Sequence, residues 1–506
     1  MKFKTNKTRY ISTFILSYLI GVGLLDISLR YILGTAIDNT FLLFYVNTLK
    51  YALFFGLILI ILNVLKPENR LRSHIINLSK SFWIVALHPL FSSLVNQEVT
   101  GYIVSTDHIG LLLLIFIISL IMAISSFTKL TRNAISFCLI IASYFPVFYI
   151  NRIALNIKPE ASFELYQILS VDVFGEDKVI LISNQYYLIA VLLIIEISLV
   201  YLLLARISFG KTFKELINII RPFRTLHFVM MVILGVIFVR TVTPEEALSL
   251  TSINHFPFVF IPALCLALVW QFTTLLNDLY DQDIDEKVHP DRPLISGALK
   301  RYHHIDLLIT TGLLSSLFSL FLGAPIFLLN LAAISLAVIY SIPPLRLRDR
   351  MFGSICVGLG SVVGFLAGVY SPPSWHVKNF ISSIWIKREI SFYPEILLAC
   401  FLITVVLSIS PLINALPDYE GDLKAGVNNI YTVLGFQKGK KLVTILIIFL
   451  FLAPIVFLST ILDFIILLLP GIIASIIFYR LEDHRPVFGL YFLVLSYLIL
   501  RFLSMI

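Results

Sequence analysis

Two acidic segments carry the side chains best suited to chemistry in this chain. In each, one Asn and two Asp recur at intervals of four: Asn277, Asp281 and Asp285 in the first, Asn414, Asp418 and Asp422 in the second. Asp278 stands beside the first set. On a helix, residues four apart advance only about 40° around the axis. Each set is therefore predicted to form one polar stripe.

Both sets follow long apolar runs, where a carboxylate is unfavourable by about 2.5–3.5 kcal/mol in a membrane helix. A single set would most simply be solvated loop acids beside basic residues, but two matching sets favour bound cations and a negatively charged ligand that bridges them. Mg²⁺ fits, because it combines one or two carboxylates with substrate phosphates. Bound Mg²⁺ would neutralise a diphosphate and make it a better leaving group. The predicted metal ligands are Asn277, Asp278, Asp281, Asp285, Asn414, Asp418 and Asp422.

Membrane-spanning helices are the elements that must position these residues. The 506 residues are 58% hydrophobic and 13% charged, whereas a soluble protein carries about a quarter charged residues. The sequence therefore predicts an all-α polytopic membrane bundle. Apolar runs of spanning length lie near residues 11–29, 41–64, 109–127, 133–150, 186–207, 225–241, 256–276, 305–322, 324–341, 352–371, 395–416, 441–459, 461–479 and 486–505, with a weaker candidate at 81–95.

The distribution of charge predicts the orientation of these spans. The net charge of +8 comes from Lys and Arg in short loops between apolar runs, so positive-inside topology explains it better than nucleic-acid binding. With the N-terminus inside, the acidic stretch 160–177 lies outside and both acidic sets lie at the cytoplasmic face. The loop 372–394, which holds three basic residues, is the one outside loop that fits poorly.

A basic amphipathic segment, residues 211–224, suits an interfacial helix and is the predicted domain boundary. Residues 1–210 hold six candidate spans and no acidic set, and their role is not indicated by any motif. Glu196 lies in the middle of a span there, and it either has a functional role or pairs with a polar group on a neighbouring helix. Asp26 and Arg30 are predicted to pair because they stand four apart. Residues 211–506 hold nine candidate spans and both acidic sets.

Three stretches of the second domain together resemble the UbiA superfamily of intramembrane prenyltransferases. Residues 277–299 (NDLYDQDIDEKVHPDRPLISGAL) are similar to its NDxxDxxxD motif followed by the RP-L-x-SG element. Residues 340–347 (YSIPPLRL) are similar to its YSxPPxRL loop. Residues 418–426 (DYEGDLKAG) are similar to its second DxxxD motif with the trailing K-x-G. The resemblance covers about residues 215–506.

This resemblance implies a nine-helix bundle whose central cavity opens sideways into lipid. It implies Mg²⁺-dependent transfer of a prenyl group from a prenyl diphosphate to a lipophilic acceptor, with Asp281, Asp285, Asp418 and Asp422 as the catalytic acids. Arg292, Tyr340, Arg346 and Lys424 are the substrate-binding residues that it implies. Arg221 and Arg224 either reach the same pocket or anchor the chain at the cytoplasmic surface.

Two alternatives stay open at this point. The pair His289-Pro290 resembles the sequence of relatives that transfer a phosphoribosyl group to polyprenyl phosphate. An ion-coupled transporter also uses broken helices and intramembrane acids, although it would place the acids near the midplane of the membrane. Among prenyl acceptors, the motifs favour glycerol-phosphate lipids or chlorophyll-type alcohols over quinones, and the acceptor itself is left open.

Overall fold

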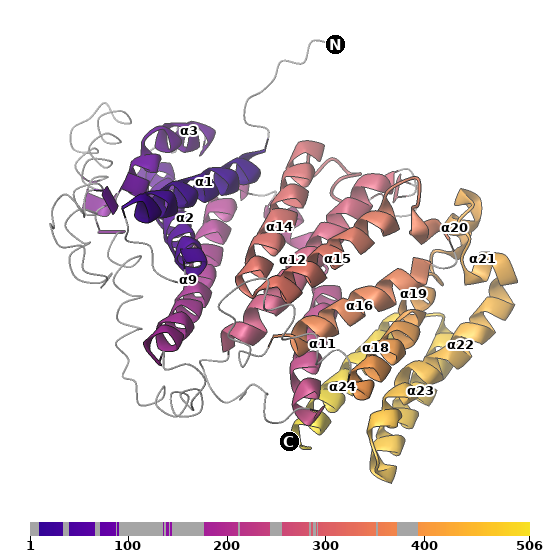
Figure 1. The fold of residues 1–506 in the computed structure, drawn as a ribbon. Helices are drawn as coiled ribbons and strands as arrows, with labels where there is room; N and C mark the ends of the chain where they lie inside the picture. The colour runs from indigo at the N-terminus through magenta and orange to yellow at the C-terminus, as the bar shows by residue number, and fades with distance from the viewer. Residues whose placement is uncertain are drawn as a thin grey trace. The chain divides into compact units, whose positions relative to one another are not determined.

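Helices are the only regular elements within the described ranges of this computed structural model, and no strand occurs there (Figure 1). Eleven described helices are long and apolar enough to cross a membrane, so the predicted all-α polytopic membrane protein is confirmed. The total number of spans stays a prediction, because 109–127 and most of 133–150 lie outside the described residues. The description covers residues 10–33, 40–65, 71–87, 177–210, 213–242, 256–282, 292–350, 353–371 and 393–505, with isolated positions at 89–90, 135, 138–140, 142–143, 285–286 and 290.

The chain divides into two compact units, Met1–Lys214 and Glu215–Ile506. The first unit contains α1 (Ile11–Ile32), α2 (Thr40–Leu65), α3 (Leu71–Phe82), η1 (Trp83–Leu87) and α9 (Asp177–Phe209). Helix α2 packs against both α1 and α9. Of the weak candidate span 81–95, the described residues belong mainly to the end of α3 and to η1, and none of them forms a spanning helix.

A buried polar network joins α1 to α2 in the first unit. The carboxylate of Asp26 is fully buried and accepts hydrogen bonds from Arg30 Nε at 3.1 Å, Asn47 Nδ2 at 2.8 Å and the Tyr51 hydroxyl at 3.0 Å. The predicted pair of Asp26 and Arg30 is thus confirmed within a larger network. Glu196 on α9 has one buried carboxylate oxygen without a hydrogen-bond partner among the described residues, and its predicted role stays a prediction.

The second unit is a bundle of long helices connected by short ones. Its membrane-length segments are α11 (Pro222–Val242), α12 (Phe256–Tyr280), α14 (Arg301–Phe321), α15 (Ala324–Ser341), α18 and α19 (Pro394–Leu407 and Ile409–Asn414), α22 and η9 (Phe436–Leu452 and Ala453–Phe457), α23 (Ile461–Leu481) and α24 (Arg485–Leu503), with the shorter apolar α16 (Gly353–Val369). The short elements are η6 (Leu347–Asp349), α20 (Tyr419–Ala425) and α21 (Ile430–Leu434).

The segment predicted as one interfacial helix, residues 211–224, is interrupted. Helix α10 (Phe213–Asn218) ends before a turn, and α11 begins at Pro222. Proline is favoured at the first position of a helix, where its missing N–H has no partner to lose. It disfavours helical backbone in the residue before it. Pro222 therefore separates the two helices and leaves Arg221 in the turn between them.

Successive long helices of the second unit alternate in direction, and this brings distant motifs to one end of the bundle, here called the acidic end. Arg221 before α11 bonds Asp278 near the end of α12. The amide of Asn428 donates to the carbonyl oxygen of Asp349 at 3.1 Å, which joins the loops that follow α15 and α20. The alternation therefore explains how the two acidic segments approach each other.

Two glycines allow α11 and α16 to approach each other closely. A Cβ atom on Gly235 would lie 2.0 Å from the carbonyl oxygen of Phe365, and one on Gly368 would lie 2.0 Å from that of Val232. Only glycine avoids these contacts, since backbone atoms cannot move aside as a flexible side chain can. Further along α11, Phe238 makes edge-to-face contacts with Phe365, 5.5 Å between ring centroids, as part of the buried apolar core.

Candidate active site

The first acidic segment continues the helical hydrogen bonding of α12 beyond its last residue. The amide of Asp281 donates to the carbonyl oxygen of Asn277 at 3.0 Å, and the amide of Asp285 donates to that of Asp281 at 2.8 Å. Asn277, Asp281 and Asp285 therefore lie on successive turns, as their spacing predicts. The side chains of Asp281 and Asp285 are almost fully buried.

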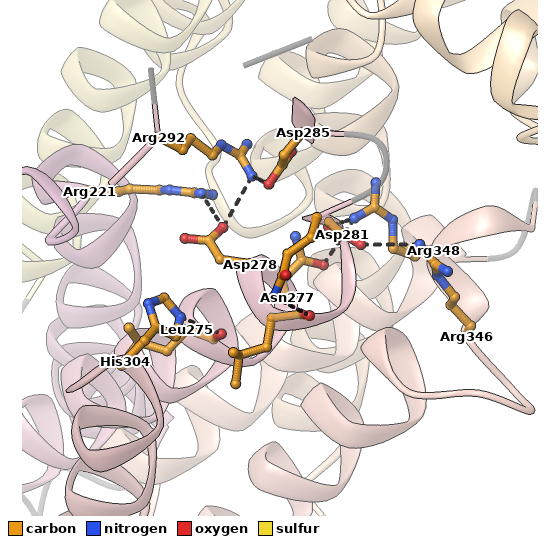
Figure 2. A network of polar contacts seen from close by, with 12 residues as sticks. Arg221, Leu275, Asn277, Asp278, Asp281, Asp285, Arg292, His304, Arg346 and Arg348 are labelled. Atoms are coloured by element: carbon orange, nitrogen blue, oxygen red, sulfur yellow. Dashed lines mark hydrogen bonds and ion pairs between the residues drawn. The ribbon is translucent and has the colours of Figure 1, made fainter. Parts of the chain in front are cut away.

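Arginines from two other parts of the chain hold the carboxylates of this segment (Figure 2). Asp278 Oδ1 accepts hydrogen bonds from Arg221 Nη2 at 2.9 Å and from Arg292 Nη1 at 3.1 Å. Arg292 also forms an ion pair with Asp285. Burial lowers the pKa of Arg221, and the negative charge of Asp278 opposes that shift. The structure thus connects Arg292, predicted as a substrate-binding residue, directly to two of the predicted metal ligands.

The loop around η6 supplies the partners of Asp281 (Figure 2). Arg346 Nη2 lies 3.3 Å from Asp281 Oδ1, and Arg348 pairs with the other carboxylate oxygen. Arg348 Nη1 also donates to Asn277 Oδ1 at 3.3 Å. Sequence reasoning singled out Arg346, which lies within the YSxPPxRL loop, and missed Arg348, which directly follows that loop. The sequence signal that could have identified Arg348 is the recurrence of arginine at every second position, 346, 348 and 350.

The second acidic segment differs from the prediction of one continuous stripe. Asn414 ends α19 and Asp418 directly precedes α20, so a turn containing Pro417 separates them. Proline has no N–H to donate and interrupts helical hydrogen bonding. Only Asp418 and Asp422 are joined by a helical bond, at 2.9 Å between the Asp422 amide and the Asp418 carbonyl oxygen.

Asp422 lies in an environment that disfavours its negative charge. Burial raises its pKa to about 6, and the negative charge of Asp418 acts in the same direction. Arg348 and a hydrogen bond from Asn429 Nδ2, 2.7 Å from Asp422 Oδ2, oppose this shift. Asn429 also caps α21 through its own side-chain oxygen. A nearby cation would stabilise the ionised pair of Asp418 and Asp422.

A cavity of about 1460 Å³ in the second unit brings the two acidic segments together. All seven predicted metal ligands line it: Asn277, Asp278, Asp281, Asp285, Asn414, Asp418 and Asp422. Of the predicted substrate-binding residues, Arg292 and Tyr340 line it too. Arg346 is not a lining residue, but it bonds Asp281, which is. The side chain of Lys424 lies outside the described residues.

The remaining cavity wall is largely apolar and aromatic. Phe228 and Trp270 stack with 4.9 Å between ring centroids, and both line the cavity. Arg221 and Arg224, for which the sequence left two roles open, are among the lining residues as well. The cavity therefore combines a charged acidic end with a largely apolar wall.

The donor chemistry at the acidic end fits Mg²⁺. Among the described residues, no group of three His, Cys, Asp or Glu side chains surrounds a single point, and the oxygen donors that line the cavity are the carboxylates and amides of the two acidic segments. Mg²⁺ is commonly held in this way, by one or two carboxylates together with waters and substrate phosphates.

Comparison with known proteins points to one family. A family model described as the UbiA prenyltransferase family matches residues 235–494. The digeranylgeranylglyceryl phosphate synthase of Metallosphaera sedula is 28% identical over 193 residues, which cover 38% of this chain and 61% of that protein. The chloroplastic chlorophyll synthase of Avena sativa is 29% identical over 178 residues, which cover 33% of this chain and 43% of that protein. The chain thus spans less than two thirds of the length of either relative.

Two solved structures of UbiA homologues also match part of this chain. One from Archaeoglobus fulgidus, bound to GPP and Mg²⁺, has a TM-score of 0.43 at 19% identity and covers 57% of this chain and 99% of that one. The apo structure of a homologue from Aeropyrum pernix has a TM-score of 0.43 at 15% identity and covers 56% of this chain and 97% of that one. Because the family model matches slightly more than half of the sequence, the chain belongs to the UbiA prenyltransferase family.

Proposed function

We propose that the second unit catalyses Mg²⁺-dependent transfer of a prenyl group from a prenyl diphosphate to a lipophilic acceptor within the membrane. The observation that carries the proposal is that both acidic segments and several arginines line one cavity whose remaining wall is largely apolar. This is the combination that a diphosphate with a long apolar chain requires. The names of the prenyl-transferring relatives are in keeping with this activity.

The charges of the cavity wall support a need for divalent cations. The described lining residues include six arginines and six acids, namely Arg221, Arg224, Arg292, Arg348, Arg350 and Arg485 with Glu215, Asp278, Asp281, Asp285, Asp418 and Asp422. Their formal charges cancel when all are ionised. A diphosphate would bring several further negative charges, and these need cations beyond the described residues that line the cavity.

Some residues of the cavity would stabilise the diphosphate leaving group, and others would protect the carbocation. Asp281, Asp285, Asp418 and Asp422 would hold the metal, with Asn277, Asp278 and Asn414 completing the oxygen donors. Bound Mg²⁺ would supply positive charge to the departing diphosphate. Arg292 and Arg348 would add hydrogen bonds to the same group, and the apolar wall would exclude water from the allylic cation.

The acidic end of the bundle belongs, in this proposal, to the cytoplasmic side of the membrane. The support is the charge of the loops, since short cytoplasmic loops carry an excess of Lys and Arg. Prenyl diphosphates are charged at one end, so a site at the membrane boundary can take the diphosphate from water while the prenyl chain stays in the apolar part of the cavity. Lys424 and Tyr340 are proposed to contribute to substrate binding at this boundary.

The test is Mg²⁺-dependent release of diphosphate from geranyl diphosphate, measured with the purified full-length protein, together with mass spectrometry of prenylated lipid. Asp281→Ala and Asp418→Ala should each abolish both signals. Glu286→Ala and Glu420→Ala are matched controls, because these acids are exposed, neighbour the two sets in sequence, and do not line the cavity. Full turnover in Asp281→Ala or Asp418→Ala would refute the assignment of the metal site.

The same assay separates the two alternatives. Ion flux in vesicles without diphosphate release would indicate a transporter, and a product carrying phosphoribose would indicate phosphoribosyl transfer. His289, on which the second alternative drew, lies outside the described residues.

A further inference from the structure

A second polar cluster lines the cavity, and the proposed reaction at the acidic end gives it no task. Tyr491 on α24 lies with its hydroxyl oxygen 2.9 Å from Nδ1 of His227 on α11. The other ring nitrogen of His227, Nε2, lies 3.0 Å from Oγ of Ser361 on α16. Tyr491, His227 and Ser361 all line the cavity, so three helices contribute one hydrogen-bonded chain to its wall.

The hydrogens of this chain have one arrangement that satisfies every contact. Ser361 Oγ also lies 3.0 Å from the carbonyl oxygen of Val357, which can only accept. If the Ser361 hydroxyl donates to Val357, its oxygen accepts from Nε2–H of His227, and Nδ1 is left to accept from the Tyr491 hydroxyl. The opposite direction would leave the contact between Ser361 and Val357 without a hydrogen and make one hydrogen bond fewer.

This direction determines what Tyr491 offers to a molecule in the cavity. Its single hydrogen is directed at His227, so its phenolic oxygen presents only lone pairs to the cavity. Such a group accepts a hydrogen bond from a hydroxyl. It offers no donor to an ionised carboxylate or to a quinone carbonyl. The surroundings are aromatic, with the ring of Phe228 4.9 Å from that of His227 and stacked on Trp270.

We propose that the chain of Tyr491, His227 and Ser361 accepts the proton of an acceptor that carries a hydroxyl group, an inference that rests on the prenyl transfer proposed above. The acceptor oxygen uses a lone pair to form the new C–O bond to the first carbon of the prenyl group. The bond from that carbon to the diphosphate breaks and its electron pair leaves with the diphosphate. The acceptor proton passes to the Tyr491 oxygen as the Tyr491 proton passes to Nδ1 of His227.

His227 takes up this proton only transiently, because its apolar and aromatic surroundings disfavour the charged imidazolium, and water receives the proton when the products leave. Once Nδ1 is protonated, the imidazolium donates to Tyr491 and to Ser361, and both of these oxygens are already in place. Ser361 is accordingly a positioning residue that keeps Nε2 protonated, whereas Tyr491 is the group that would touch the acceptor. The product is an ether.

The experiment uses membranes that contain the full-length protein and its lipids, incubated with Mg²⁺ and geranyl diphosphate labelled in its prenyl chain. Released diphosphate, prenylated lipid and free prenyl alcohol are measured together. With the unaltered protein we expect prenylated lipid that withstands alkaline hydrolysis, as an ether does. In Tyr491→Phe we expect transfer to fall at least about tenfold while diphosphate release persists, because the cation still forms and is captured by water. His227→Gln should shift the ratio of prenyl alcohol to prenylated lipid in the same direction.

Tyr497→Phe is the matched control, because its hydroxyl also joins α24 to another helix, at Asp463 on α23, and it does not line the cavity. If Tyr491 only stabilises the fold, Tyr491→Phe should lose diphosphate release and prenyl transfer in equal proportion. This result would overturn the inference. An alkali-labile product would overturn it too, since that identifies an ester from a carboxylate acceptor. Absence of any Mg²⁺-dependent diphosphate release by the unaltered protein would instead refute the proposed function, and the inference with it.

Discussion

Arg348 offers the sharpest test of the charge arrangement at the acidic end. It pairs with Asp281, donates to Asn277 and lines the cavity, so it connects the predicted metal ligands to the space where a diphosphate would lie. Its side chain is 18% exposed, against 2% for Asp281. Arg348→Met keeps much of the length and apolar volume of the side chain and removes only its charge and its donors.

Two effects of this substitution can be separated by size. Removing one preorganised donor from a developing negative charge costs about 2.7–4 kcal/mol, or roughly 10²–10³ in kcat. Leaving a buried carboxylate short of one partner costs about 1–3 kcal/mol of stability, and Arg346 remains bonded to Asp281. We therefore expect a protein that still folds but turns over at least about a hundredfold more slowly.

The comparison variant is Arg346→Met, which removes the other arginine partner of Asp281 from a position that does not itself line the cavity. Diphosphate release and thermal unfolding are measured on both proteins in detergent. If the reasoning holds, the two variants lose similar stability, while kcat falls much further in Arg348→Met. Equal losses of kcat would show that Arg348 acts only by holding Asp281 in place.

Three other substitutions test the packing and the polar contacts. Gly235→Ala should lower the unfolding free energy by about 1–3 kcal/mol through overpacking against the Phe365 carbonyl. The control Gly489→Ala should not, because a Cβ atom at that position meets nothing within 4 Å. An unchanged unfolding midpoint in Gly235→Ala would contradict the close approach of α11 and α16. Asp26→Ala should destabilise the first unit by about 1–3 kcal/mol because it removes the buried carboxylate that accepts hydrogen bonds from Arg30, Asn47 and Tyr51, and limited proteolysis of that unit would report it. Asn429→Ala removes a helix cap worth about 1 kcal/mol and the hydrogen bond to Asp422, so Mg²⁺ binding measured by calorimetry should weaken; an unchanged affinity would separate Asn429 from the metal site.

The fold class and most described spans of the second unit could be predicted because long apolar runs have few other stable structures. Where prediction was wrong, a proline was involved. Pro222 divides the segment expected to be one interfacial helix, and Pro417 divides the second acidic set between α19 and α20. Spacing by four describes a stripe only while the backbone stays helical, and the proline at each position was visible in the sequence.

The partners of the acids were harder to predict than the acids themselves. Intervals of four are a local property of the sequence, but Arg221 and Asp278 are separated by 57 residues and Arg348 and Asn277 by 71. Such pairs depend on which helix ends meet, and that follows from the alternating direction of the spans. Likewise, nothing in the sequence around His227 or Tyr491 indicated that they lie 2.9 Å apart across two helices.

The alternation of the spans also explains why the charged and apolar parts of the cavity are separated. Apolar spans can end in carboxylates only where water, cations or arginines are within reach, because an unpaired charge inside the membrane is too unfavourable. The described acids of the first set meet this condition through Arg221, Arg292, Arg346 and Arg348, all of which come from outside the apolar spans. Further along the cavity wall lies the uncharged contact of His227 with Ser361. A substrate charged at one end and apolar along the rest therefore has a single favourable direction in this cavity, with its charged group among the arginines and its chain along the aromatic wall.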